Sequence, residues 1–211
     1  MTIEFSKWPV KKRLETPFSI SVSSADYYEG VFVSASQGGL TGWGESVPSP
    51  RVTGETVESA CYRLEALFRD VEGMGLDEGA EFLKGKRGSA AAGLDMALLD
   101  LGLKLEGKTA RERFRLEGDG FPTSFTVPSK LLLKGTGYLE KAAGRWGAEI
   151  FKLKLSGEPA RDLEGLKAAR AAFPEAGIRL DANTAYDYES ALELMSGAAG
   201  LGVEFIEQPL P

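Results

Sequence analysis

Ile150-Phe151-Lys152-Leu153-Lys154-Leu155 is the stretch that decides the fold of this chain. Side chains alternate along a β-strand, so the apolar residues share one face and the two lysines share the other. Similar short apolar stretches begin near Thr123, Ile178 and Val203. Successive starts lie 25 to 28 residues apart, with helical patterns between them at about 137–146, 159–173 and 188–199. This repeat predicts a parallel sheet with crossover helices.

The preceding part of the chain has a different pattern. Residues 27–35 are rich in aromatic and β-branched residues, and Gly38-Gly39 then leads into residues 40–45, which predicts an antiparallel hairpin. From Thr53, a candidate cap, apolar residues recur at three- and four-residue steps, and a second helix is expected from about Ser89 to Leu105. These elements predict an α+β domain.

One local match to a phosphate-binding loop has a simpler explanation. Residues 102–109, Gly-Leu-Lys-Leu-Glu-Gly-Lys-Thr, fit the pattern of that loop. A phosphate loop must leave a strand and open a helix, whereas Gly102 lies inside an amphipathic helical pattern. We interpret the segment as a helix end with a C-terminal glycine.

Composition narrows the chemistry. The 211 residues include 25 Lys and Arg, 31 Asp and Glu, and no His, for a net charge of −6. Histidine-based triads and zinc sites are therefore excluded for this sequence, and proton chemistry must use Lys, Asp, Glu or Tyr. The acidic balance favours a small-molecule substrate over nucleic acid or a membrane surface. A single cysteine, Cys61, and the lack of any long apolar run lead us to expect a cytoplasmic protein.

Polar side chains stand where the predicted strands end. Asp181 and Asn183 follow one strand, and Glu207 ends the next. In βα barrels the functional groups stand at the carboxyl ends of strands, and two carboxylates there make a hard-cation site suited to Mg²⁺. Taken singly, Asp181 could cap a helix and Glu207 could be an ordinary polar residue at a strand end.

The two lysines are the second candidate feature. In a barrel of βα units the apolar face packs on helices, so Lys152 and Lys154 would point inward. Burial and mutual repulsion are then expected to depress the pKa of at least one of them, as a general base requires. The alternative is an edge strand with a solvated lysine face.

These motifs resemble the muconate-lactonizing branch of the enolase superfamily. The barrel segments in question are 151–155, 180–183 and 206–209. The segments 42–46, 49–55 and 92–101 resemble the capping domain of that branch. Residues 50–55 and Thr126-Val127 are most similar to dipeptide epimerases of the L-Ala-D/L-Glu type. The resemblance implies a capping domain over residues 1–120 and the first half of a modified (β/α)₈ barrel, about four strands, over residues 121–211.

The resemblance also implies a role for each matching residue. Lys154 would remove the α-proton of the substrate, and Lys152 would support it and touch the substrate carboxylate. Asp181 and Glu207 would be two of three Mg²⁺ ligands. Substrate contacts would come from Thr126, Asn183 and Lys152, and from Arg51 in the capping domain, where an ordinary polar loop is the alternative. The implied activity is Mg²⁺-dependent epimerisation of a dipeptide through an enediolate, in a homo-oligomer.

The chain also departs from the family pattern. The family's third metal ligand and opposing lysine belong to later strands, which this sequence does not contain. The arginine that dipeptide epimerases often place in the first loop is replaced here by Ser21-Val22-Ser23. A muconate cycloisomerase or an o-succinylbenzoate-synthase-like enzyme would use the same lysines and carboxylates. An inactive, truncated half barrel is the alternative from another class.

Overall fold

The computed structural model describes residues 2–20, 23–118 and 120–211. It contains two compact units. Met1–Arg13 and Tyr27–Asp119 form the first, and Leu14–Asp26 and Gly120–Pro211 form the second. The predicted domain boundary near residue 120 stays a prediction. Within the described residues, no helix combines the length and the apolar character needed to cross a membrane.

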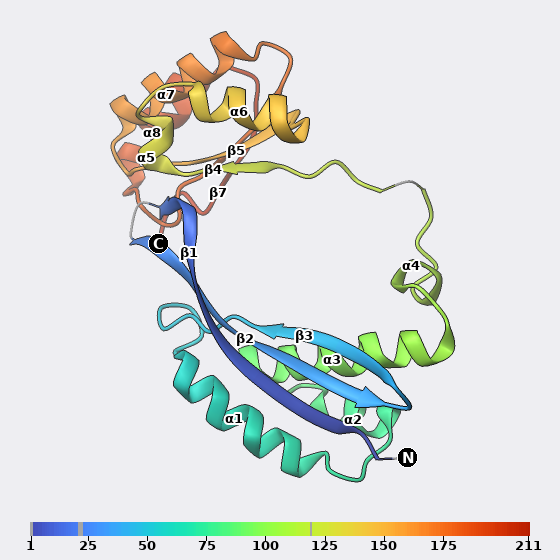
Figure 1. The fold of residues 1–211 in the computed structure, drawn as a ribbon. Helices are drawn as coiled ribbons and strands as arrows, with labels where there is room; N and C mark the ends of the chain where they lie inside the picture. The colour runs from blue at the N-terminus through green and yellow to red at the C-terminus, as the bar shows by residue number, and fades with distance from the viewer. Residues whose placement is uncertain (1, 21–22, 119) are drawn as a thin grey trace. The chain divides into compact units, whose positions relative to one another are not determined.

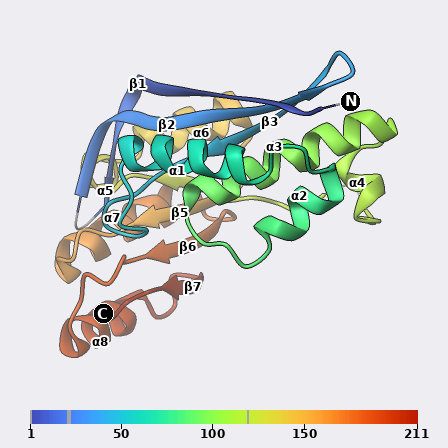
Figure 2. The same cartoon turned by 90° about the horizontal axis from the view of Figure 1, so that it is seen from below.

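The first unit is built on a three-stranded sheet in the order β1, β2, β3 (Figure 1). The strands are β1 Glu4–Ile20, β2 Ser23–Gln37 and β3 Leu40–Ser46. The predicted hairpin is confirmed, because β2 and β3 pair antiparallel with Gln37 opposite Leu40 across the Gly38-Gly39 turn. The helices α1 Val57–Asp70, α2 Leu76–Leu83 and α3 Ser89–Glu106 lie on one side of this sheet (Figure 2).

Helix α3 packs closely on β3 because the β3 residues that face the helix, Gly42 and Gly44, have no side chain. A Cβ atom built on Gly44 would lie 1.9 Å from the carbonyl oxygen of Gly93, and one on Gly42 would lie 2.2 Å from that of Ala97. No side chain fits at these distances. Leu64, Leu94 and other fully buried aliphatic residues complete the core between the helices and the sheet.

The start of α1 and the end of α3 can be compared with the predictions made from the sequence. Helix α1 begins after Thr56 rather than Thr53, because Thr56 and Ser59 form a reciprocal capping box, whereas the Thr53 hydroxyl donates to the carbonyl oxygen of Ser49. Helix α3 ends at Gly107, whose φ of 64° is left-handed. The interpretation of residues 102–109 as a helix end is therefore confirmed. A short helix, α4 Ala110–Arg113, follows.

The second unit contains a four-stranded parallel sheet in the order β4, β5, β6, β7. Its strands are β4 Phe125–Val127, β5 Ile150–Lys154, β6 Gly177–Asp181 and β7 Val203–Glu207. Its helices are α5 Ser129–Leu132, α6 Gly137–Trp146, α7 Pro159–Ala172 and α8 Tyr188–Ala198. The predicted fold class is confirmed: an antiparallel sheet with helices is followed by a parallel α/β sheet.

The apolar face of β5 is buried, with Phe151, Leu153 and Leu155 each at most 1% exposed in a core shared with α6, α7 and α8. The other face of the sheet is left for the two lysines. The tip of the long β1 and β2 strands also belongs to this unit, since the amide of Lys130 donates to the Ser19 hydroxyl over 3.2 Å. Ser21 and Val22, in the segment where the resemblance expects an arginine, lie outside the described residues.

Candidate functional site

The strand register brings the predicted chemical residues onto one face of the parallel sheet. Lys154 pairs with Asp181, and Asp181 pairs with Glu207 on the next strand. Residues paired across parallel strands point to the same side, so one cation and two carboxylates form a row at the carboxyl ends of β5, β6 and β7. Lys152 lies one step below, on the same face. With Asn183, these residues are called the lysine–carboxylate cluster.

Asp181 is the centre of this cluster. Its side chain is 1% exposed, and its Oδ2 atom lies 2.6 Å from the Nζ atom of Lys154 and 2.8 Å from that of Lys152. Lys152 also reaches the Oε2 atom of Glu207 at 2.6 Å. The Lys152 and Lys154 side chains are 21% and 12% exposed. Neither lysine therefore belongs to a solvated edge, and the alternative of an exposed lysine face is wrong.

The charges in the cluster perturb one another. Burial acts most strongly on Lys152 and lowers its pKa, but the hydrogen bonds and charges of Asp181 and Glu207 together raise that pKa above its ordinary value. For Asp181, burial raises the pKa, and the two ammonium groups outweigh it and lower the pKa. We expected a depressed pKa for at least one of the two lysines, but the pKa of Lys152 is raised, because two carboxylates contact its ammonium group.

Asn183 completes the cluster from the loop after β6. Its backbone amide donates to the Oδ1 atom of Asp181 at 3.0 Å, and its side-chain oxygen accepts from Lys154 at 3.1 Å. The residue has a φ of 50°, and the next residue, Thr184, has a φ of 64°. Left-handed backbone at two consecutive non-glycine residues is unusual and turns the amide back toward the carboxylate.

Thr126 and Arg179 lie beside Lys152 on the same face. The register pairs Lys152 with Thr126 of β4 on one side and with Arg179 of β6 on the other. Arg179 binds Glu204 at 2.7 Å and lies over the ring of Phe205. We did not predict Arg179 as part of this face, although its alternation with the buried Ile178 and Leu180 is the signal that indicates it.

Arg51 belongs to the first unit, in the exposed turn between β3 and α1. That turn is held by three backbone amides, those of residues 52–54, which all donate to the carbonyl oxygen of Ser49. Glu55 then enters the protein interior and accepts a 2.7 Å hydrogen bond from the amide of Ser89 at the start of α3. Sequence reasoning missed Glu55, because a carboxylate directly after an exposed turn gives no sign of burial.

A divalent cation fits the chemistry of the cluster. Carboxylate and amide oxygens are the ligands that Mg²⁺ prefers, and Asp181, Glu207 and Asn183 supply them from adjoining strand ends. The ammonium groups against Asp181 and Glu207 show that this pair accommodates positive charge. Among the described residues, no group of three or more Asp, Glu or Cys side chains is placed to hold a metal, and the cluster brings two carboxylates together.

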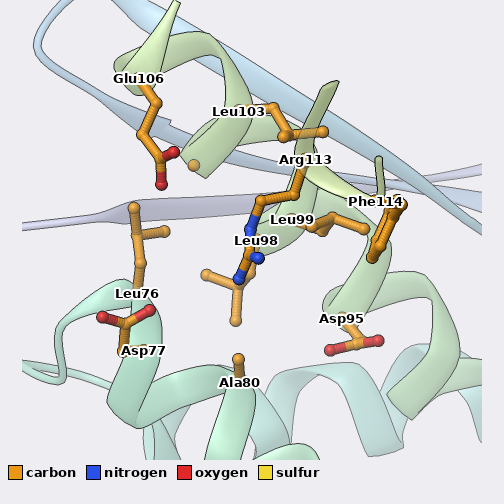
Figure 3. A pocket seen from close by; sticks show the side chains of 11 residues that line it. Leu76, Asp77, Ala80, Asp95, Leu98, Leu99, Leu103, Glu106, Arg113 and Phe114 are labelled. Atoms are coloured by element: carbon orange, nitrogen blue, oxygen red, sulfur yellow. The ribbon is translucent and has the colours of Figure 1, made fainter. Parts of the chain in front are cut away.

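A separate hollow lies in the first unit, among α2, α3 and the end of α4 with the residue that follows it (Figure 3). It has a volume of about 310 Å³, and Leu98 and Leu103 are its buried apolar residues. Asp77, Asp95, Glu106 and Arg113 surround it. None of the predicted site residues lines this cavity.

Comparison with known proteins identifies the two parts of the chain. Residues 2–110 match the family model of the mandelate racemase / muconate lactonizing enzyme N-terminal domain, and residues 138–211 match the enolase C-terminal domain-like model. The chain is 34% identical to the L-Lys-D/L-Arg epimerase of Methylococcus capsulatus, over 94% of this chain and 58% of that protein. It is 30% identical to the o-succinylbenzoate synthase of Bacillus subtilis, over 93% of this chain and 54% of that protein.

Solved structures show the same fold. The dipeptide epimerase of Methylococcus capsulatus, complexed with Mg and the dipeptide L-Arg-D-Lys, matches with a TM-score of 0.87 at 28% identity. The match covers all of this chain and 62% of the other. The chain thus spans between 54% and 62% of the length of these relatives.

Proposed function

The chain belongs to the mandelate racemase / muconate lactonizing enzyme family, and on this basis we propose that its chemistry is that of a Mg²⁺-dependent dipeptide epimerase. The observation that supports this most directly is the row of Lys154, Asp181 and Glu207, in register on three neighbouring strand ends. The epimerases named among the matched proteins support the substrate class.

We propose Lys154 as the base for the α-proton and Lys152 as the residue that supports it and holds the substrate carboxylate. Both ammonium groups are partly buried and oriented by Asp181, so their nitrogen atoms are fixed before substrate arrives. Asp181 and Glu207 would hold Mg²⁺. Bound there, the cation would stabilise the negative charge that develops on a carboxylate when its α-proton leaves.

We also propose substrate contacts for Thr126, Asn183 and Arg51. Thr126 stands beside Lys152 on the same face, and Asn183 fixes the position of Lys154. Arg51 would read the distal end of the dipeptide. Its replacement by Ala should raise KM without changing Mg²⁺ affinity, because it lies in an exposed turn of the first unit.

Two measurements test the proposal. Mn²⁺ binding to the chain, followed by electron paramagnetic resonance, should be lost in Asp181→Asn and in Glu207→Gln. Exchange of the α-proton for deuterium in D₂O with Mg²⁺, over a dipeptide panel, should occur in wild type and in Lys167→Met, an exposed lysine on α7. It should disappear in Lys154→Met. Exchange on no dipeptide would refute the assignment.

The cycloisomerase and o-succinylbenzoate-synthase alternatives use the same lysines and carboxylates, and the identity to the Bacillus subtilis synthase favours the second of them. Turnover of the synthase substrate without dipeptide exchange would select it. A homo-oligomeric assembly and a cytoplasmic location stay predictions. Light scattering of the purified chain tests the first.

A further inference from the structure

Asp162 is a fully buried carboxylate that the proposed chemistry does not use. It lies in the first turns of α7, and its exposed fraction is 0%. A buried carboxylate is costly unless several donors satisfy it, and Asp162 has four. These are the amide of Ser156 at 2.9 Å, its hydroxyl at 2.9 Å, the amide of Gly157 at 3.1 Å and the hydroxyl of Tyr186 at 2.5 Å. We call Asp162 and the three residues that supply these donors the Asp162 network.

The network joins the loops that follow two catalytic strands. Ser156 stands two residues after Lys154, and the amide between them, that of Leu155, donates to the carbonyl oxygen of Asp181 at 3.0 Å. Gly157 has a φ of 93°, and a Cβ atom there would lie 3.2 Å from that of Ala185, so the two loops are in close contact. Asp162 thus fixes the end of β5 against the end of β6.

Tyr186 brings the loop after β6 into the same network. It is 2% exposed, and burial together with its hydrogen bond to Asp162 raises the pKa of its phenol. Its own amide donates to the carbonyl oxygen of Pro209 at 3.2 Å, and the amide of Thr184 donates to that of Gln208 at 2.8 Å. The left-handed backbone at Asn183 and Thr184 needs such anchors, because an isolated loop would relax away from it.

We propose that Asp162 is a positioning residue, which acts through Ser156 and Tyr186 to hold Lys154 and Asp181 in the arrangement that proton transfer requires. Its importance for catalysis rests on the proposed function. The positioning itself is measurable without metal or substrate, so the two ideas fail separately. Loss of Mn²⁺ binding or of deuterium exchange would count against the proposed function and leave this inference standing.

The test uses the whole 211-residue chain and its Asp162→Asn variant, at a temperature where circular dichroism shows both to be folded. An amine-reactive succinimidyl ester labels lysines, and peptide mass spectrometry gives the labelling rate of Lys154 relative to the exposed Lys167. We expect the ratio to rise about tenfold, because a hydrogen bond to a charged group is worth roughly one factor of ten in an equilibrium. An unchanged ratio overturns the proposal.

Two further variants separate positioning from stability. Leu166→Ala removes a fully buried side chain from the same helix without touching the network, so it should destabilise the second unit and leave the labelling ratio unchanged. If it raises the ratio as much as Asp162→Asn does, the proposal is wrong. Tyr186→Phe removes only the phenol hydroxyl. It should speed hydrogen exchange at the Thr184 amide and increase Lys154 labelling, and no change in either refutes the link to β6.

Discussion

Asp181→Asn tests the central pairing of the lysine–carboxylate cluster by its effect on stability. The substitution keeps the shape of the side chain and the oxygen that can accept from the Asn183 amide at 3.0 Å. It removes the negative charge that both ammonium groups face, at 2.6 and 2.8 Å. Two partly buried cations are then left beside each other.

The expected cost follows from burial. Breaking a buried ion pair by removing one partner costs about 3 to 5 kcal/mol. Lys152 keeps Glu207 at 2.6 Å, and both lysines retain some access to water, so we place the cost at roughly 2 to 3 kcal/mol. Glu207→Gln is the matched control. The Glu207 side chain is 43% exposed, and within the described part of the chain its only ion pair is with Lys152, so the substitution should cost less than about 1 kcal/mol.

Urea unfolding measures this difference if the signal comes from the second unit. The chain has three tryptophans, and Trp146 belongs to the second unit, where it stacks on Phe125 with ring centroids 5.1 Å apart. A Trp8→Phe/Trp43→Phe background leaves Trp146 as the reporter. Equal destabilisation by Asp181→Asn and Glu207→Gln would refute the reasoning.

A double variant checks the sign of the electrostatics. Lys154→Met in the Asp181→Asn background removes the ammonium group that has lost its carboxylate partner, whereas Lys152 still has Glu207. It should therefore restore part of the lost stability, about 1 kcal/mol, since replacing a whole buried pair is less costly than breaking it. A further loss in the double variant would show that packing, not charge, dominates at Asp181.

Three other perturbations have definite signs. Burial raises the pKa of Glu55, but hydrogen bonds from Ser89 and Thr53 and the charge of Arg63 together outweigh burial and lower that pKa. The stabilisation that ionised Glu55 contributes is therefore present above the unfolded pKa of about 4.3 and is lost as the pH falls through the folded value. Urea midpoints of Glu55→Gln should accordingly depend less on pH below about pH 5 than those of wild type. Gly44→Ala should lower the stability of the first unit by about 3 kcal/mol in thermal unfolding, because the new Cβ would lie 1.9 Å from the Gly93 oxygen; an unchanged Tm would contradict the close packing. Lys152→Met should raise Mg²⁺ affinity about tenfold in calorimetric titration, because a competing hydrogen bond to a charged group is gone, and weaker binding would count against a metal at this pair.

The sequence predicted the elements whose signals are local. The alternation in residues 150–155 placed both lysines on one face, and the helix at Gly137–Trp146 has the predicted bounds. The predicted start of α1 was wrong because either Thr53 or Thr56 could cap the helix. The choice depends on the folded structure, in which Thr53 bonds to Ser49 and Thr56 bonds to Ser59. The eight-residue α2 was missed because its apolar pattern is too short to stand out from its glycine-rich flanks.

Asp162 shows why part of the site lies beyond sequence reasoning. In the sequence it is one acid near the start of a helix, a common and uninformative position. Its significance comes from burial and from donors on two loops, one of which is 24 residues away along the chain. The burial of Glu55 has the same origin, since its partner Ser89 lies 34 residues away.

The raised pKa of Lys152 has a consequence for the chemistry of the cluster. Alternation along one strand makes the two lysines neighbours, and from this alone repulsion is the natural conclusion. The register across strands puts Asp181 beside Lys154 and Glu207 beside Asp181, so each ammonium group has a carboxylate oxygen within 2.8 Å. On the proposed function, the carboxylates that orient the ammonium groups are the same ones that would hold Mg²⁺. A divalent cation held by Asp181 and Glu207 would compete with Lys152 and Lys154 for the same carboxylate oxygens, so metal binding would weaken the ion pairs that hold the two ammonium groups.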